Sequence, residues 1–209
     1  MKPDCEVLRK SDYEVRKVDL DVCQSMVKRF HYARGGSNTG TFCHGLFRRG
    51  DETPLGIAWW IPPTKGAAKA TFPEGDWQQV ISLSRLVVHP DIPQNAATFM
   101  LGKSMKMIGR DGRYPCLVTY ADTWQGHDGT IYRASNWEDK GLTKPEAVWV
   151  DSEGRMVARK AGPKTRRKHE MEELGYRMLG RFAKRKFRKV LLTSKGTGYT
   201  PEDHDDHTD

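Results

Sequence analysis

The chain has 209 residues, of which 37% are hydrophobic and 30% charged, and its formal net charge at pH 7 is +8. This length predicts one sizeable core, or one core with an appended element, because domains typically span ~100–200 residues. No stretch approaches the ~20 apolar residues of a membrane span, and charges throughout the first twenty residues exclude a secretory signal. We therefore expect an intracellular protein.

The N-terminal third of the chain predicts a helix, a glycine loop and a hairpin. Apolar residues at helical spacing predict an amphipathic helix over residues 19–30, and the following HYARGGSNTG predicts a loop because of its glycines. Residues 41–63 predict two strands around a turn at 49–53, closed by two prolines. In the second strand, adjacent Trp59 and Trp60 should place one ring on each face of the sheet.

The middle of the chain alternates strands and helices. After an irregular connector at 66–77, the segment VISLSRLVV alternates and then runs apolar like a central strand over residues 80–88. Apolar spacing predicts a helix over 95–108, with Asn95 as its N-terminal cap. CLVTYAD predicts the next strand, DGTIYRASNW a short helix, and residues 147–160 a hairpin with its turn at DSEGR.

The positive charge is concentrated near the C-terminus. Between Arg155 and Lys189, fourteen Lys and Arg stand against three Glu, a net charge of +11 that leaves −3 for the rest of the chain. We predict a basic helix or pair of turns over 166–192, with Phe182 and Phe187 in its apolar stripe, followed by a polar, disordered tail. Clustered cations with interleaved aromatic rings favour contacts with DNA phosphates. A solvated basic helix without a partner is the alternative.

Cysteine and histidine spacing offers no metal signature. The four cysteines are Cys5, Cys23, Cys43 and Cys116. They form no CxxC or Cys/His pair of zinc-site spacing, so we expect reduced, partly buried thiols and no disulfide framework. Four other side chains could in principle meet around a metal, namely His31, His44, Asp122 and His127. No ligand spacing supports such a cluster, and we predict no metal site.

The turn at residues 91–98, where the strand over 80–88 leads into a helix, suits an anionic ligand. A helix start leaves unpaired backbone N–H groups, which bind phosphate or pyrophosphate together with the helix dipole. An ordinary crossover connection is the alternative, and this feature alone does not separate the two.

Two motifs resemble the GNAT acyltransferase superfamily. LVVHPD followed by a helix is similar to its central motif, in which a strand ending in Val-His-Pro leads into a pyrophosphate loop for acyl-coenzyme A. Downstream, IYRASNW resembles the superfamily pattern of Tyr, three residues and Gly-Phe, with Tyr132 at the tyrosine that often protonates the departing thiolate. The loop departs from the pattern, because Pro93, Ala96 and Thr98 stand where GNAT enzymes usually have Arg or Gln and two glycines.

The resemblance implies an α/β (α+β) fold with a central splayed mixed sheet and flanking helices. It also implies acetyl-coenzyme A or a related acyl donor as the cofactor. Residues 1–165 would form the GNAT-like catalytic domain, residues 166–194 a basic helical extension packed on it, and residues 195–209 the disordered tail.

A narrower resemblance is to the Mom family of phage proteins. It rests on FHYARGG, on SLSRLVV followed by a loop without glycine, on YADTWQGHDGTIYRASNW and on the basic C-terminus, and it covers residues 30–168. Members of this family are GNAT-like proteins that modify adenine in DNA to a carbamoylmethyl-type derivative and so protect phage DNA from host restriction. The resemblance implies a transferase that acts on double-stranded DNA in the cytoplasm of the host cell.

Candidate site residues follow from this resemblance and from the chemistry of the side chains. Transfer to a base nitrogen needs a proton route and stabilisation of developing charge. The catalytic candidates are Tyr132, Asp122, Ser84, His31 and Tyr32. The cofactor-binding candidates are Leu86, Val87, Val88, Gln94, Asn95, Ala96, Ala97, Thr98 and Asn136. The DNA-binding candidates are Arg85, Lys164, Arg166, Arg167, Lys168, Arg181, Lys184, Arg185 and Lys186.

Several candidates have a structural alternative. Tyr132 could be a core tyrosine, and His31 a helix C-terminal histidine that interacts with the dipole. Asp122, together with His127, could orient or deprotonate an acceptor, but Asp122 could instead be a turn cap and His127 a surface residue.

Ser84 and Arg85 are neighbours on one strand. Their side chains should point to opposite faces, so we expect at most one of them to line a given cleft. A charged Arg in a central strand needs a partner or an anionic ligand.

Other functions remain open from the residues alone. The chain could be a GNAT N-acetyltransferase that acylates an amine on a hypermodified pyrimidine in phage DNA. It could also be a non-catalytic nucleic-acid-binding protein on a GNAT scaffold, which the altered loop supports. A protein or small-molecule acetyltransferase is a third alternative.

Overall fold

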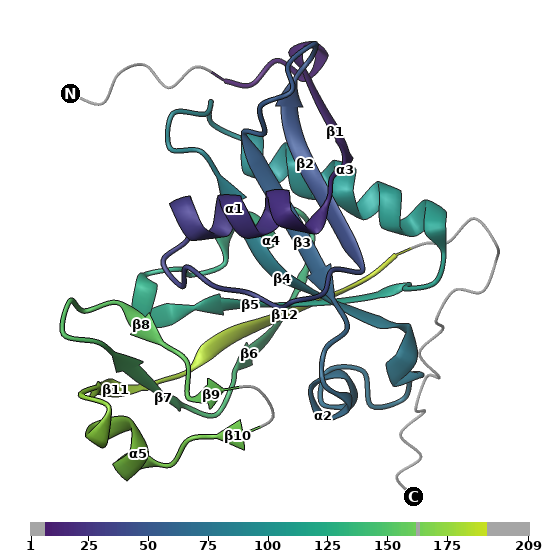
Figure 1. Ribbon diagram of the computed structural model, residues 1–209. Coiled ribbons are helices and arrows are strands. Elements are labelled where there is room, and N and C mark those ends of the chain that lie inside the picture. The colour runs from purple at the N-terminus through teal and green to yellow at the C-terminus, as the bar shows by residue number, and fades with distance from the viewer. Residues whose placement is uncertain (1–6, 162–163, 192–209) are drawn as a thin grey trace, which may run out of the picture.

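The computed structural model describes residues 7–161 and 164–191. Within them, one seven-stranded sheet has the order β1-β2-β3-β4-β5-β12-β6, with β4 and β5 as its parallel pair and antiparallel pairing elsewhere (Figure 1). The strands are β1 (Tyr13–Lys17), β2 (Phe42–Arg48), β3 (Gly56–Ile61), β4 (Val80–Val88), β5 (Cys116–Asp122), β6 (Glu138–Leu142) and β12 (Lys184–Val190). The sheet is therefore mixed, as predicted.

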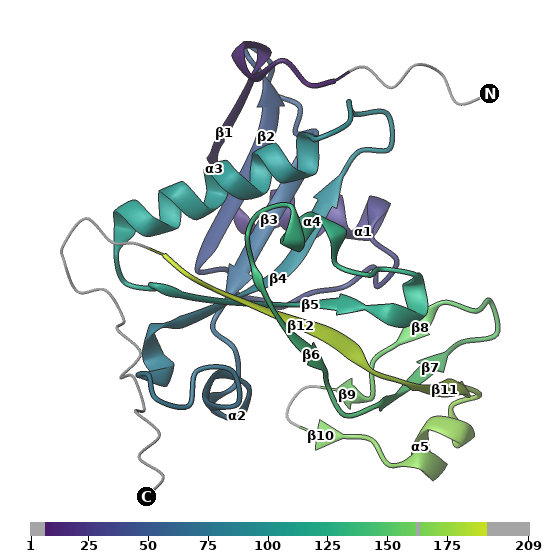
Figure 2. The ribbon, with the colours of Figure 1, turned by 180° about the vertical axis from the view of Figure 1, so that it is seen from behind.

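Two long helices cover opposite faces of this sheet. Helix α1 (Leu20–Phe30) lies in front of β3 and β4 in Figure 1, and α3 (Ala96–Asp111) lies in front of the sheet when the molecule is seen from behind in Figure 2. The shorter helices are α2 (Lys65–Lys69), α4 (Thr130–Arg133) and α5 (Lys168–Glu173). Three single turns of 3-10 helix are η1 (Lys10–Asp12), η2 (Trp77–Gln79) and η3 (Thr123–Gln125).

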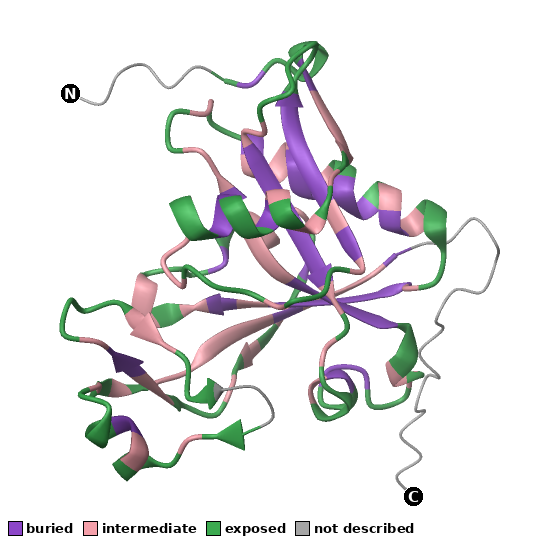
Figure 3. Ribbon diagram, viewed as in Figure 1, coloured by how far each residue is buried: buried purple, intermediate pink, exposed green. Residues whose placement is uncertain are grey.

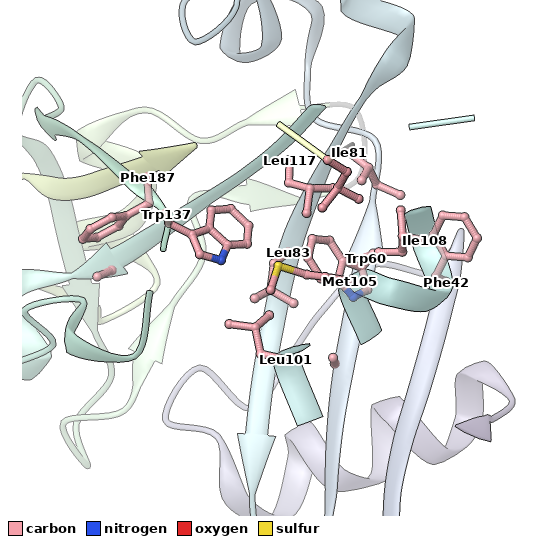
Figure 4. Close-up of a cluster of buried hydrophobic side chains, with 13 residues drawn as sticks. Phe42, Trp60, Ile81, Leu83, Leu101, Met105, Ile108, Leu117, Trp137 and Phe187 are labelled. Atoms are coloured by element: carbon pink, nitrogen blue, oxygen red, sulfur yellow. The ribbon is translucent and has the colours of Figure 1, made fainter. Parts of the chain in front are cut away.

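Each long helix builds a separate hydrophobic cluster with the sheet. On one face, Leu101, Met105 and Ile108 of α3 pack with Trp60 (Figure 4). On the other face, the apolar stripe of α1 packs with Trp59. Both tryptophans are fully buried, so the predicted placement of one ring on each face is confirmed. Figure 3 shows that burial is concentrated where the helices cover the central strands.

A smaller sheet lies beside the N-terminal end of β12. It has the order β11-β7-β8, with β7 (Glu146–Val150), β8 (Met156–Val157) and β11 (Arg177–Phe182). A two-stranded ribbon, β9 (Lys160–Ala161) and β10 (Lys164–Thr165), connects it to α5. The β7–β8 turn forms because the Asp151 carboxylate accepts the backbone N–H groups of Glu153 and Arg155, and the predicted hairpin is confirmed. We call residues 143–183 the basic lobe.

The predicted basic C-terminal helix is wrong for most of its length. Only Lys168–Glu173 is helical, and the chain then forms β11 and β12. Strand β12 lies inside the main sheet, with β5 on one edge and β6 on the other, so both edges of its backbone are hydrogen-bonded. The predicted boundary between the catalytic domain and the extension at residue 165 would separate β12 from the sheet that contains it. The predicted tail at 195–209 lies outside the described residues.

Tertiary contacts also decided several smaller features. Strands β1 and β6 were not predicted, and the connector at 66–77 contains α2. Helix α3 continues to Asp111, and Asn95 at its start has φ +73° and makes no side-chain capping hydrogen bond. Its predicted capping role is therefore wrong, although the position of the helix start is right.

Three of the four cysteines lie in the described residues. Cys23, Cys43 and Cys116 are free thiols, the first and last of them buried. Cys5 lies outside those residues. No helix in the described part of the chain has the length and apolar character needed to cross a membrane.

A buried polar network joins β2, β3 and α3. The Nδ1 atom of His44 lies 2.7 Å from Oγ of Ser104, which also accepts a hydrogen bond of 2.8 Å from Nε1 of Trp60. His44 is 1% exposed, and its burial, with the nearby charge of Lys17, lowers its pKa to about 4. The imidazole is therefore neutral at pH 7.

We predict that this histidine makes the fold sensitive to acid. The unfolded chain takes up the proton near pH 6.5 and the folded chain only near pH 4, so stability is lost as the pH falls through this window. Chemical denaturation at pH 7 and pH 4 should show a loss about 3 kcal/mol larger for the wild type than for His44→Gln. Equal losses in the two proteins would contradict the assignment.

Candidate active site

A cavity opens where β4 and β5 separate. These strands pair only from Val80 with Cys116 to Leu83 with Thr119, after which β5 continues along β12 and β4 along β3. The splayed sheet predicted from the sequence is therefore present. The resulting cavity has a volume of about 510 Å³, within the range of small-molecule sites.

All five catalytic candidates line this one cavity. They are His31, Tyr32, Ser84, Asp122 and Tyr132. They come from the end of α1, from β4, from the end of β5 and from α4, so the chain folds four separate segments around one space.

A bulge in β4 changes the orientation of Ser84 and Arg85. Trp60 pairs with Leu83 and Trp59 pairs with Arg85, so Ser84 has no partner residue on β3. Strict alternation fails at this point, and both Ser84 and Arg85 line the cavity. The prediction that at most one of them does so is wrong.

The guanidinium group of Arg85 is bonded inside the protein. Its Nε and Nη2 donate to the carbonyl oxygen of Gly35 at 3.1 and 2.9 Å, and Nη1 donates to the carbonyl of Ser84 at 2.7 Å. Burial lowers its pKa. Arg85 therefore fastens the glycine loop to the cavity wall, a different use from the predicted contact with DNA.

Asp122 is held from two sides at the end of β5. It lies opposite Lys184 in the β5–β12 register, and Nζ of Lys184 is 3.1 Å from its Oδ1. The hydroxyl of Tyr32 donates to its Oδ2. The side chain of Asp122 is only 11% exposed. Because a carboxylate can accept about four hydrogen bonds, these two contacts orient Asp122 and leave it able to accept another.

Tyr32 and Tyr132 both keep their protons at neutral pH. Burial raises the pKa of Tyr32, and its hydrogen bond to Asp122 adds to the effect. Burial also raises the pKa of Tyr132, opposed by a hydrogen bond with Thr119 and supported by the charge of Asp122. The ring of Tyr132 packs against Trp137 and Phe187, with centroids at 5.7 and 5.2 Å. Tyr132 is thus a fixed, protonated phenol that lines the cavity.

His31 is a neutral imidazole. Burial and the charge of Arg85 lower its pKa to about 4, and its Nδ1 accepts a hydrogen bond of 3.1 Å from the backbone N–H of Ala33. Its ring lies 4.2 Å from that of Tyr32, at an interplanar angle of 30°. A neutral ring makes no ionic interaction with the helix dipole, so the alternative role considered for His31 is not supported.

The cofactor-binding candidates are divided by the fold. Three of them line the cavity, namely Leu86, Val88 and Ala97. Val87 points to the other face and packs with the α1 cluster, and Ala96 is buried beside Met100. The remaining candidates, Gln94, Asn95, Thr98 and Asn136, are outside the residues that line the cavity.

The loop before α3 does not fit the glycine-rich pyrophosphate cradle of coenzyme A. The N–H groups of Asp91 and Ile92 donate to Nδ1 and the carbonyl of His89, and that of Ala96 donates to the carbonyl of Pro93. The backbone carbonyl of Gln94 accepts from Leu8. The exposed carboxylate of Asp91 adds negative charge to this loop, which disfavours an anionic ligand.

The DNA-binding candidates on β12 are largely bonded within the protein. Nε of Arg185 lies 2.6 Å from Oδ2 of Asp139, and Nζ of Lys186 donates to the carbonyl of Ala70 at 2.9 Å. Lys184 lies in the cavity beside Asp122. Lys184 and Arg185 form ion pairs with carboxylates, and Lys186 donates a hydrogen bond to a carbonyl group. All three side chains belong to a strand inside the sheet.

The remaining DNA-binding candidates lie in the basic lobe. Lys164 is paired with Glu170, Lys168 lies 3.7 Å from Glu172, and Arg181 donates to a backbone carbonyl at 3.1 Å. Lys164, Lys168 and Arg181 are exposed, so each remains accessible to another anion. No ion pair holds the guanidinium groups of Arg166 and Arg167 in the described part of the chain.

Part of the cavity wall comes from residues that were not among the catalytic or binding candidates. The segment from Gly126 to Ile131 lines the cavity, and Gly129 lies directly against the ring of Phe187. Its signal was the pair of glycines around His127 and Asp128, which allows a tight loop. Within residues 7–161 and 164–191, no three His, Cys, Asp or Glu side chains gather in a way that could hold a metal ion.

The fold is that of the GNAT N-acetyltransferases. A putative acetyltransferase from Acinetobacter baylyi has a TM-score of 0.53 and 9% identity, over 91% of this chain and 96% of that one. A putative acetyltransferase from Salmonella typhimurium, solved with its cofactor acetyl-CoA, has a TM-score of 0.53 and 9% identity, over 92% and 99%. Polyamine N-acetyltransferase from Drosophila melanogaster gives 0.51 and 12%, over 86% and 100%.

Within that fold class, the chain belongs to the Mom protein family, whose model matches residues 12–202. Methylcarbamoylase mom of Escherichia phage Mu is 22% identical over 145 residues. The matched segment is 68% of this chain and 59% of the phage Mu protein, so the chain spans somewhat more than half of that relative. The family resemblance inferred from the sequence motifs is confirmed.

We predict that Gly129 cannot be replaced without damage to the cavity wall. Its φ is +85°, and an added Cβ would overlap the buried ring of Phe187. Gly141 has φ +76° but open space around it, so Gly141→Ala is the matched control for backbone strain. Gly129→Ala should lower the free energy of unfolding by about 1–3 kcal/mol more than Gly141→Ala. Chemical denaturation measures both losses of unfolding free energy. Equal losses in the two variants would contradict the prediction, because they would show that the surroundings of Gly129 relieve the overlap.

Proposed function

We propose that the protein is a transferase that modifies adenine in double-stranded DNA. The observation that carries this proposal is the convergence of Tyr32, Ser84, Asp122 and Tyr132 on one cavity of a GNAT fold. Membership of the Mom family, which includes the methylcarbamoylase of phage Mu, supports DNA as the substrate. In the cytoplasm of a host cell, such a modification would protect phage DNA from restriction.

Asp122 is the proposed acceptor of the proton from the attacking base nitrogen. Tyr32 and Lys184 fix its orientation, and the cavity gives a base access to it. As the bond from the nitrogen to the transferred group forms, one N–H proton passes to the carboxylate and then to solvent.

Tyr132 is the proposed donor of the proton to the leaving group. Its raised pKa keeps the hydroxyl protonated until the leaving group departs with the bonding electron pair. Ser84, on the bulge of β4, offers a hydrogen bond to the transferred carbonyl group. The apolar side chains of Leu86, Val88 and Ala97 would hold the acyl part of the donor.

The basic lobe is the proposed contact with the DNA phosphates. Its DNA-binding candidates are Lys164, Arg166, Arg167, Lys168 and Arg181. Strand β11 ends at Phe182, two residues before Lys184 in the cavity, so the lobe is continuous with the cavity wall. Phosphate contacts there would position the duplex without reading its sequence.

We predict that DNA from cells expressing the protein carries a modified adenine nucleoside. Tyr132→Phe and Asp122→Asn should each reduce its amount on the order of 100-fold, because each removes one partner in proton transfer. Tyr114→Phe, outside the cavity lining, is the control and should not change it. Mass spectrometry of digested plasmid DNA makes the measurement. Unmodified DNA from folded wild-type protein would contradict the proposal, and a modified pyrimidine would favour acylation of a hypermodified base instead.

A non-catalytic nucleic-acid-binding protein is the second candidate function. The observation that favours it is the loop before α3, whose N–H groups of Asp91, Ile92 and Ala96 already have partners. DNA binding that persists with no new nucleoside in the preceding experiment would support this role.

We predict that the salt dependence of DNA affinity separates the two groups of cations. Arg166→Gln and Arg167→Gln should each reduce the slope of log K against log[salt] by roughly one, because each removes one phosphate contact. Arg185→Gln should instead lower the melting temperature, since it breaks the pair with Asp139, and leave the slope unchanged. Fluorescence anisotropy of a labelled duplex at several salt concentrations tests this. A slope unchanged by both lobe variants would place the DNA elsewhere.

A further inference from the structure

Tyr32 and His127 line the cavity beside Asp122, and Trp124 lies against Tyr32. The catalytic roles proposed above use only Tyr32 of these three rings. We propose that Tyr32, Trp124 and His127 form a stacking site for a purine base extruded from the duplex. This inference rests on the proposed function and deepens it, because it names where the acceptor base is held.

The three rings lie close together. The ring centroids of Tyr32 and His127 are 6.0 Å apart with an interplanar angle of 33°, and Trp124 meets Tyr32 edge-on at 6.0 Å and 88°. Tyr32 is already supported by His31 at 4.2 Å. His127 is exposed, and within the described residues its ring makes no hydrogen bond. An exposed ring held next to a cavity without a polar partner is available to a planar ligand.

The backbone keeps His127 beside Asp122. The N–H group of His127 donates to the carbonyl of Asp122 at 3.3 Å, which ties this loop to the end of β5. Gly126 and Gly129, with φ +73° and +85°, allow the loop to turn sharply on both sides of His127. On its far side, the Asp128 carboxylate accepts the N–H of Thr130 at 2.9 Å. The loop conformation is thus fixed by local bonds that do not involve the imidazole.

Chemistry on a base nitrogen requires such a site. A base inside a duplex cannot reach a cavity between two strands, so it must leave its stack, and a protein offsets that cost by stacking the base on aromatic rings. The exocyclic amine of an aminopurine is a hydrogen-bond donor, and the acceptor that lies next to Tyr32 is Asp122. The rings would hold the face of the base while the carboxylate receives its edge.

The site also joins the basic lobe. Trp124 packs against Phe182 at the end of β11, with ring centroids 6.2 Å apart. The proposed phosphate contacts and the proposed base site are therefore linked through two rings in contact.

The first test separates stacking from proton transfer at His127. Mass spectrometry of DNA from expressing cells should show modification reduced on the order of ten-fold in His127→Ala, the loss expected for one stacked base. His127→Phe should restore modification, because a phenyl ring stacks but cannot carry a proton. Wild-type modification in His127→Ala would overturn the proposal. Equal losses in the Ala and Phe variants would also overturn it, by assigning His127 to proton transfer.

A second readout does not depend on modification. Single-stranded oligodeoxyadenylate should quench the tryptophan fluorescence of the full chain, and an abasic oligomer of the same length should not. Trp124→Phe should abolish this quenching, and Trp77→Phe, which removes a tryptophan of another cluster, should retain it. Quenching without any wild-type modification would refute the proposed transferase and keep the base site. Equal quenching by both oligomers, or quenching that survives in Trp124→Phe, would refute the base site.

Discussion

The separation of β4 from β5 is the constraint on which the rest of the structure depends. The two parallel strands pair for only four residues, and each then follows a different neighbour. The strands β3 and β12 hydrogen-bond the outer edges of β4 and β5, whereas the facing inner edges have no strand partner beyond Leu83 and Thr119. The inner edges face the cavity, and the residues beyond Leu83 and Thr119 become its walls.

Several cations of β12 are bonded within the protein. Strand β12 pairs with β5 along its whole length on one edge and with β6 on the other. Its side chains alternate between the two faces of the sheet. Arg185 neutralises Asp139, Lys186 bonds to a carbonyl after α2, and Lys184 fixes Asp122 at the cavity. Part of the charge that suggested a DNA-binding helix is therefore bonded to acceptors within the protein. The basic lobe carries the cations that remain accessible.

The cavity joins groups whose protonation is set by their surroundings. Burial keeps Tyr32 and Tyr132 protonated and His31 neutral, while Lys184 lies beside the carboxylate of Asp122. A carboxyl group that can accept a proton and a phenol that can donate one therefore line the same space, as general acid–base catalysis of group transfer requires. The loop before α3 is separate from this arrangement, and its N–H groups of Asp91, Ile92 and Ala96 are bonded within the protein.

The sequence by itself determined the elements whose patterns are local. The strand over 80–88, the helix that follows it and the paired motifs around Tyr132 were predictable, because alternation, helical spacing and motif order are written in neighbouring residues. Only the tertiary structure decided the fate of residues 184–190. Their spacing suits a helix, but β5 and β6 offer backbone partners on both edges, and that pairing prevails. It also decided that both Ser84 and Arg85 face the cavity, since a bulge depends on the opposing strand, which no local pattern reveals.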